Sequence, residues 1–139
     1  MVSLLSTLLD KLRKLFQKDQ STGSNLHLPK EEEQRFTLFL KGLKVGKLSC
    51  EDGEWTFAYS EAFKARSDEF YPIVGFPKLD KVYKSKSLWP FFLIRIPGLG
   101  QPRVREIIKA EHLDINNEAQ LLRRFGRKTV ANPFELSSV

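Results

Sequence analysis

The side chains that most often do chemistry are scarce in this 139-residue chain and lie far apart. The single cysteine is Cys50, and the two histidines are His27 and His112. A metal centre needs several ligands brought together, and a nucleophile needs a base beside it. Neither pattern occurs here. The sequence therefore predicts no metal site, no cofactor and no catalytic residue, and it favours a binding module over an enzyme.

Phosphate binding is a second kind of chemistry, and it is only weakly indicated by Gly98-Leu99-Gly100. This segment precedes Pro102 and an expected helix start, where free N–H groups favour anions. It lacks the further glycine and the lysine of a phosphate-binding loop. The catalytic and metal-binding motifs of protein kinases are absent from the sequence as well.

The whole chain has a net charge of +6, and its positive charge is concentrated in the second half. Residues 31–80 hold 10 acidic and 7 basic residues, a net of −3, whereas residues 81–110 hold 7 basic and 1 acidic, a net of +6. A basic segment can bind an acidic protein face, a phosphate backbone or a membrane surface. Its lysines are interleaved with aromatic residues in a strip made of Lys78, Lys81, Tyr83, Lys84, Lys86 and Trp89.

Leucines at helical spacing predict an amphipathic helix over residues 1–18. Burying one such side chain is worth about 1.5–3 kcal/mol, so this stripe is expected to pack on the domain, a second copy, a partner or a membrane. Residues 19–34 are polar and rich in turn formers, which indicates a linker. No run of about 18 apolar residues occurs, and the N-terminus lacks the layout of a signal peptide, so we expect a cytoplasmic protein without a transmembrane segment.

The domain proper is expected over residues 35–126, with an extended tail over 127–139. Glycines near residue 42 and the Asp52-Gly53 pair predict two reversals between three strands. Trp55, Phe57 and Tyr59 alternate with small residues, which is typical of a strand with one buried face. Two helices follow, one starting at Pro102 and one capped near Asn116 or Asn117. The fold class is therefore α+β: a small antiparallel sheet or partly closed barrel packed with C-terminal helices.

The order and spacing of these elements resemble the N-terminal domain of HipA-type serine/threonine kinases. The matching residues are Gly42, Val45-Gly46, Leu48, Gly53, Phe57, Tyr59, Phe76-Pro77, Pro90-Phe91-Phe92 and Pro97-Gly98, followed by two helices. In that family the domain packs on a kinase core that works beside a helix-turn-helix antitoxin. In some operons, termed HipBST, it is a separate small protein, HipS, that neutralises the kinase.

The resemblance implies a protein-binding, antitoxin-like module. Its implied partners are a HipA-like kinase and possibly a helix-turn-helix antitoxin, and it would contact nucleic acid only through such a partner. Trp, Tyr and Arg are the residues that most often dominate interfaces. The partner-binding candidates are Trp89, Tyr83, Lys86, Arg95, Arg123 and Arg124. Trp89 precedes a proline beside the basic strip and is expected to be more exposed than Trp55.

Two other functions stay open at this point. The helix over residues 2–18 could make the chain a peripheral membrane protein or drive self-association. The basic residues of 78–105 and 123–128 could bind nucleic acid directly, which would show as an affinity that falls steeply with salt.

Overall fold

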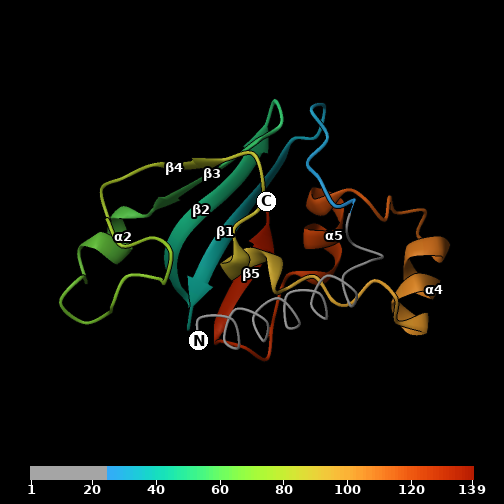
Figure 1. Cartoon of the computed structure of the whole chain (residues 1–139). Coiled ribbons are helices and arrows are strands. Elements are labelled where there is room, and N and C mark those ends of the chain that lie inside the picture. The colour runs from blue at the N-terminus through green and yellow to red at the C-terminus, as the bar shows by residue number, and fades with distance from the viewer. Residues whose placement is uncertain (1–24) are drawn as a thin grey trace, which may run out of the picture.

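The computed structural model describes residues 25–139, and the amphipathic helix predicted over 1–18 lies outside the described residues. A five-stranded, fully antiparallel open sheet forms the frame, with the strand order β4-β3-β2-β1-β5 (Figure 1). The strands are β1 (Gln34–Leu40), β2 (Leu43–Glu51), β3 (Glu54–Tyr59), β4 (Tyr83–Ser85) and β5 (Phe134–Ser138). The α+β class predicted from the sequence is confirmed, and an open sheet takes the place of the barrel alternative.

Two-residue turns join the first three strands, at Lys41-Gly42 and at Asp52-Gly53. All four turn residues have positive φ, which is the geometry of the tight hairpin turns whose twist suits antiparallel strands. The sequence predicted both reversals. They fix the register so that Leu40 faces Leu43 and Glu51 faces Glu54.

Gly46 in β2 lies against the neighbouring strand at a distance that excludes a side chain. A Cβ at this position would come within 2.6 Å of the Ala58 carbonyl oxygen and 2.8 Å of the Phe57 ring. The register between β1 and β2 also shifts at this level, because Leu38 faces Gly46 while Phe39 faces Lys44. A bulge of this kind increases the local twist of the strand.

The buried face of the sheet is lined by aromatic rings. Trp55, Phe57 and Tyr59 all point into the core, as their alternation predicted. The short helix α3 (Pro90–Leu93) covers this face, and its Phe92 ring lies 5.5 Å from that of Phe57. Burial of large aromatic side chains supplies most of the driving force for such a small domain.

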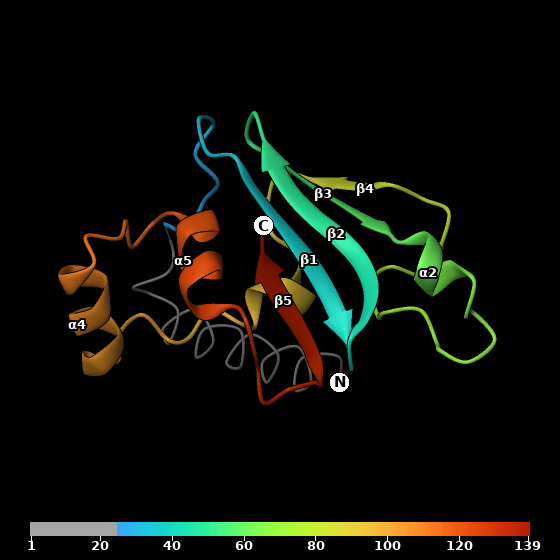
Figure 2. The same cartoon turned by 180° about the vertical axis from the view of Figure 1, so that it is seen from behind.

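Two longer helices close one end of the molecule. They are α4 (Pro102–Ala110) and α5 (Glu118–Phe125), and Asn117 caps α5 by accepting hydrogen bonds from the N–H groups of Ala119 and Gln120. As Figures 1 and 2 show, α5 lies beside the sheet and α4 lies beyond it. A second apolar cluster of Leu99, Val104, Ile108 and Leu121 joins the two helices. The fourth described helix, α2 (Glu61–Lys64), lies at the opposite end of the sheet (Figure 1).

The C-terminal segment assigned to an extended tail contains a strand of the sheet. β5 pairs with β1, so that Phe36 faces Ser138 at one end of the pair and Leu40 faces Phe134 at the other. Leu136 in β5 is buried in the core. The segment expected over residues 127–139 thus contributes the edge strand of the five-stranded sheet.

The described part of the expected linker also packs on the domain. Leu28 is buried, and the backbone of His27 hydrogen-bonds to that of Asn116 and Glu118. Glu32 accepts hydrogen bonds from Asn117 and Gln120. Burial alone would raise the pKa of Glu32, but hydrogen bonds from Gln120, Gln34 and Asn117 lower it. Residues 25–33 are therefore attached to α5.

Candidate partner-binding surface

Trp89 and Lys86 lie on the segment that joins β4 to α3, which we call the Trp89 surface (residues 86–89). Trp89 is half-buried, whereas Trp55 is fully buried, as the sequence predicted. The Trp89 indole meets the Phe76 ring edge-to-face with centroids 5.2 Å apart. Lys86 is exposed. The surface thus offers a supported aromatic edge beside an exposed cation, a combination that suits an interface hot spot.

Tyr83 lies under this surface, because its position in β4 turns the ring into the core. The side chain is only 8% exposed. Its hydroxyl accepts a hydrogen bond from the Lys78 N–H at 2.7 Å and donates one to the Lys78 carbonyl at 3.0 Å. The hydroxyl therefore acts as both donor and acceptor within the domain. The buried Tyr83 ring meets the Phe76 ring, which in turn meets Trp89.

Arg95 also differs from the exposed contact residue that the sequence suggested, since its side chain is 3% exposed. Its guanidinium donates hydrogen bonds to the backbone carbonyls of Gly126, Arg127 and Phe134 and to the side chain of Asn132, at 2.9–3.3 Å. The guanidinium also lies over the Phe91 ring at 5.8 Å. Arg95 therefore ties the end of α5 and the start of β5 to α3.

Arg123 and Arg124 are exposed on α5 and face different surroundings. The Arg124 Nε donates hydrogen bonds of 2.8 and 2.9 Å to the Glu111 carboxylate, which raises the pKa of Arg124. Arg123 lines a shallow depression along β1 and β2, together with Arg35 and Lys47. Acidic residues line the same depression, so its cations do not form a field of one sign.

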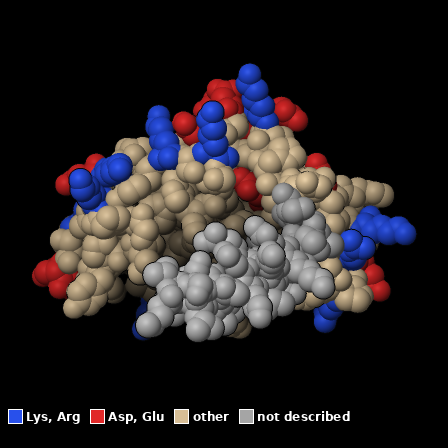
Figure 3. Space-filling view, viewed as in Figure 1, with Lys and Arg blue, Asp and Glu red and all other residues tan. Residues whose placement is uncertain are grey.

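The candidate residues therefore come together only in part. Lys86 and Trp89 share one segment, while Arg123 and Arg124 belong to α5. On the face seen in Figure 3, lysine and arginine side chains are separated by acidic and uncharged ones. The basic half of the sequence thus does not produce a continuous positive surface on this face, which weakens the case for a phosphate-backbone site there.

The residues that carry reactive groups are held apart or buried. Cys50 is buried, and burial raises the pKa of its thiol to about 11, so it stays protonated at neutral pH. His27 is exposed, with its Nδ1 3.0 Å from the Asn25 carbonyl. Within residues 25–139, no group of three or more histidine, cysteine or acidic side chains is arranged to hold a metal ion. The same residues contain no helix with the length and apolar character needed to cross a membrane.

Comparison with known families gives a match along most of the chain. The family model described as the HipA N-terminal domain matches residues 36–131, which run from β1 to the loop before β5. A comparison with curated proteins gave no match.

Proposed function

Because the chain belongs to the HipA N-terminal domain family, we propose that it is a non-catalytic module that binds a HipA-like serine/threonine kinase and neutralises it. The observation that carries this proposal is the extent of the family match, which takes in strands β1 to β4, the Trp89 surface and helices α4 and α5. This family is related to toxin–antitoxin systems.

The proposed mechanism is steric. A module whose strands are fixed by two tight turns and an aromatic core changes little on binding, so it loses little conformational entropy when it docks. Seated on the kinase, it blocks substrate access or closure of the kinase lobes. The Trp89 surface is the proposed contact because Trp89 is supported by Phe76 and Lys86 is exposed.

The test is titration of a purified HipA-like kinase from the same genome with the chain and its variants, with binding heat and kinase autophosphorylation as readouts. Trp89→Ala should weaken binding by about 2 kcal/mol or more. Lys86→Glu should weaken it by about tenfold, more at low salt than at high salt. Lys109→Glu is the matched control, because Lys109 is an exposed lysine on α4, away from the Trp89 surface.

Thermal unfolding of the same variants distinguishes a residue that contacts the kinase from one that packs within the domain. If Trp89→Ala lowers only the melting temperature and leaves kinase binding unchanged, Trp89 is a packing residue. If wild-type chain neither binds nor inhibits the kinase, the proposed function is wrong.

A further inference from the structure

The segment between α2 and β4 (residues 65–82, the 65–82 loop) carries the most exposed large apolar side chains of this end of the molecule. Tyr71 is 94% exposed and Val74 is 92% exposed. The loop projects beyond α2 at the end of the sheet opposite α4, as both views of the ribbon show (Figures 1 and 2). Tyr71 and Val74 lie three residues apart in one loop, so together they form a candidate apolar contact site.

A defined turn places these side chains at the tip of the loop. The Phe76 N–H donates a 2.9 Å hydrogen bond to the Ile73 carbonyl, and Gly75 between them has φ of 97°. This is the geometry of a turn whose third position requires glycine. Val74 therefore sits at the apex, while Ile73 and Phe76 on either side are buried in the core.

The buried hydroxyl of Tyr59 fixes this turn from below. It accepts a hydrogen bond from the Ile73 N–H at 2.9 Å and donates one to the Phe76 carbonyl at 2.7 Å. The start of the loop is held by stacked rings, since Phe70 lies on Phe63 and Phe63 lies on Tyr59, with centroids 5.8 and 5.2 Å apart. The tip is thus preorganised, which reduces the entropy that binding would cost.

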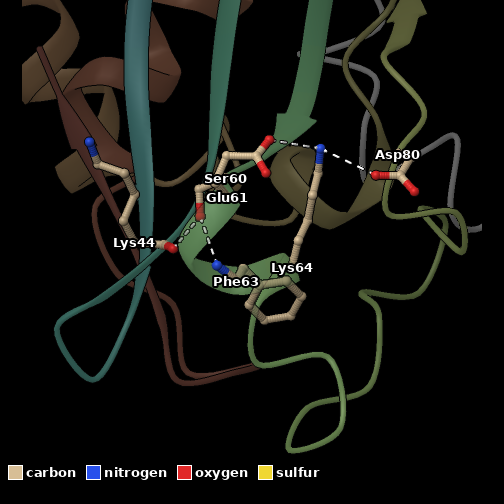
Figure 4. A network of polar contacts seen from close by, with 6 residues as sticks. All are labelled: Lys44, Ser60, Glu61, Phe63, Lys64 and Asp80. Atoms are coloured by element: carbon tan, nitrogen blue, oxygen red, sulfur yellow. Dashed lines mark hydrogen bonds and ion pairs between the residues drawn. The ribbon is translucent and has the colours of Figure 1, made fainter.

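The charges at the base of the loop are neutralised within the domain. Lys64 forms ion pairs with Glu61 at 3.2 Å and Asp80 at 3.5 Å, and Ser60 caps α2 beside them (Figure 4). Arg66 pairs with Glu69. Counted over residues 65–82, three acids (Asp68, Glu69 and Asp80) balance three bases (Arg66, Lys78 and Lys81). A neutral base with an apolar tip does not attract a phosphate backbone or an anionic membrane.

Phe76 links the turn below the tip to Trp89. The Phe76 N–H closes the turn through its hydrogen bond to the Ile73 carbonyl, and the Phe76 ring lies 5.2 Å from the Trp89 ring. The turn that carries Val74 is therefore joined to the ring that supports Trp89. A second copy of the chain is a poor occupant, because two side chains per copy bury far less than the roughly 1,200 Å² of a stable interface.

We propose that Tyr71 and Val74 form an apolar knob that inserts into a hydrophobic pocket on the HipA-like kinase. This inference rests on the proposed function and adds the contact that anchors the module. The knob supplies an aromatic anchor of the type that dominates protein interfaces, and the Trp89 surface supplies the flanking contacts.

The experiment compares the Tyr71→Ser/Val74→Ser double variant with wild type in calorimetric titration of the purified kinase. The expected loss of affinity is at least about 30-fold, the ratio that corresponds to one aromatic hot spot. The melting temperature should not fall, because both side chains lie in solvent. Val130→Ser is the matched control: Val130 is an equally exposed valine in the loop before β5, and its change should leave affinity unaltered.

Three outcomes would overturn the proposal, and they can be told apart. If the wild-type and double-variant chains bind the kinase equally, the proposed function stands and the knob is rejected. A wild-type chain that does not bind the kinase rejects both. A double variant that loses only self-association, or only binding to phosphatidylglycerol vesicles, assigns the tip to a second copy or to a membrane.

Discussion

The indole Nε1 of Trp55 donates a 2.7 Å hydrogen bond to Oε1 of Glu118, and both side chains are buried. Trp55 lies in β3 and Glu118 is the first residue of α5, so this bond connects the centre of the sheet to the helix. A buried acceptor of this kind satisfies the only polar atom of the indole. The bond orients the helix that carries Arg123 and Arg124.

Replacement of Glu118 by glutamine should make stability less dependent on pH. Burial raises the pKa of Glu118 above its ordinary 4.5, although the hydrogen bond from Trp55 acts to lower it. The folded chain then holds this proton more tightly than the unfolded chain, so the free energy of unfolding falls as pH rises from 4.5 through the raised folded pKa. Glutamine keeps an oxygen acceptor without the charge.

The measurement is urea unfolding of wild type and Glu118→Gln between about pH 4 and pH 8, where the advantage of the variant should grow with pH. Glu118→Ala serves as the comparison, since it leaves the indole N–H without a partner and should be about 1–3 kcal/mol less stable than Glu118→Gln at any pH. A constant difference between wild type and Glu118→Gln across this range would contradict the account.

Arg95→Lys should destabilise the domain rather than selectively weaken a complex. Lysine keeps the charge, but it cannot satisfy the four acceptors that the guanidinium reaches. We expect a loss of about 2 kcal/mol or more in the free energy of unfolding. Hydrogen exchange in β5 should also accelerate, because Arg95 hydrogen-bonds to the Phe134 carbonyl at its start. Unchanged stability with reduced kinase affinity would instead make Arg95 a contact residue.

Gly46→Ala should destabilise the sheet by about 1–3 kcal/mol, since the new methyl group would overlap the Ala58 carbonyl and the Phe57 ring. Gly98→Ala provides the control. Its added Cβ would lie 3.3 Å from the flexible Gln101 side chain, so its effect should stay within about 0.5 kcal/mol. Chemical denaturation measures both, and equal effects would reject the close approach at Gly46.

Tyr59→Phe should loosen the 65–82 loop while leaving its exposed side chains in place. The Ile73 N–H and the Phe76 carbonyl lose their shared partner, at a cost of about 1–3 kcal/mol. Hydrogen exchange at the Ile73 amide should accelerate, and kinase binding should weaken without any change in the side chains of the knob. An Ile73 amide that stays equally protected would show that the hydroxyl does not hold the turn.

The sequence was sufficient to place β1–β3 and the two C-terminal helices, because their signals are local. Asp52-Gly53 marks a turn, the alternation of Trp55, Phe57 and Tyr59 marks a buried face, and Asn117 marks a helix start. β5 escaped prediction because it is short and pairs with β1, about a hundred residues earlier. Nothing in a local pattern specifies such a pairing.

The candidate site was only partly predictable for a similar reason. Its residue type made Arg95 a partner-binding candidate, yet carbonyl groups from residues 126–134 converge on it only in the folded chain. The knob was missed because Tyr71 and Val74 read as ordinary apolar residues, and their exposure results from Tyr59 and Phe76 holding the backbone beneath them.

The most direct test of the central claim is calorimetric titration of a purified HipA-like kinase from the same genome with the full chain, with autophosphorylation followed in parallel. We expect a saturable complex with a dissociation constant of about 1 μM or tighter and a matching loss of kinase activity. No binding heat and undiminished autophosphorylation at about 100 μM chain, roughly a hundred times that constant, would contradict the account.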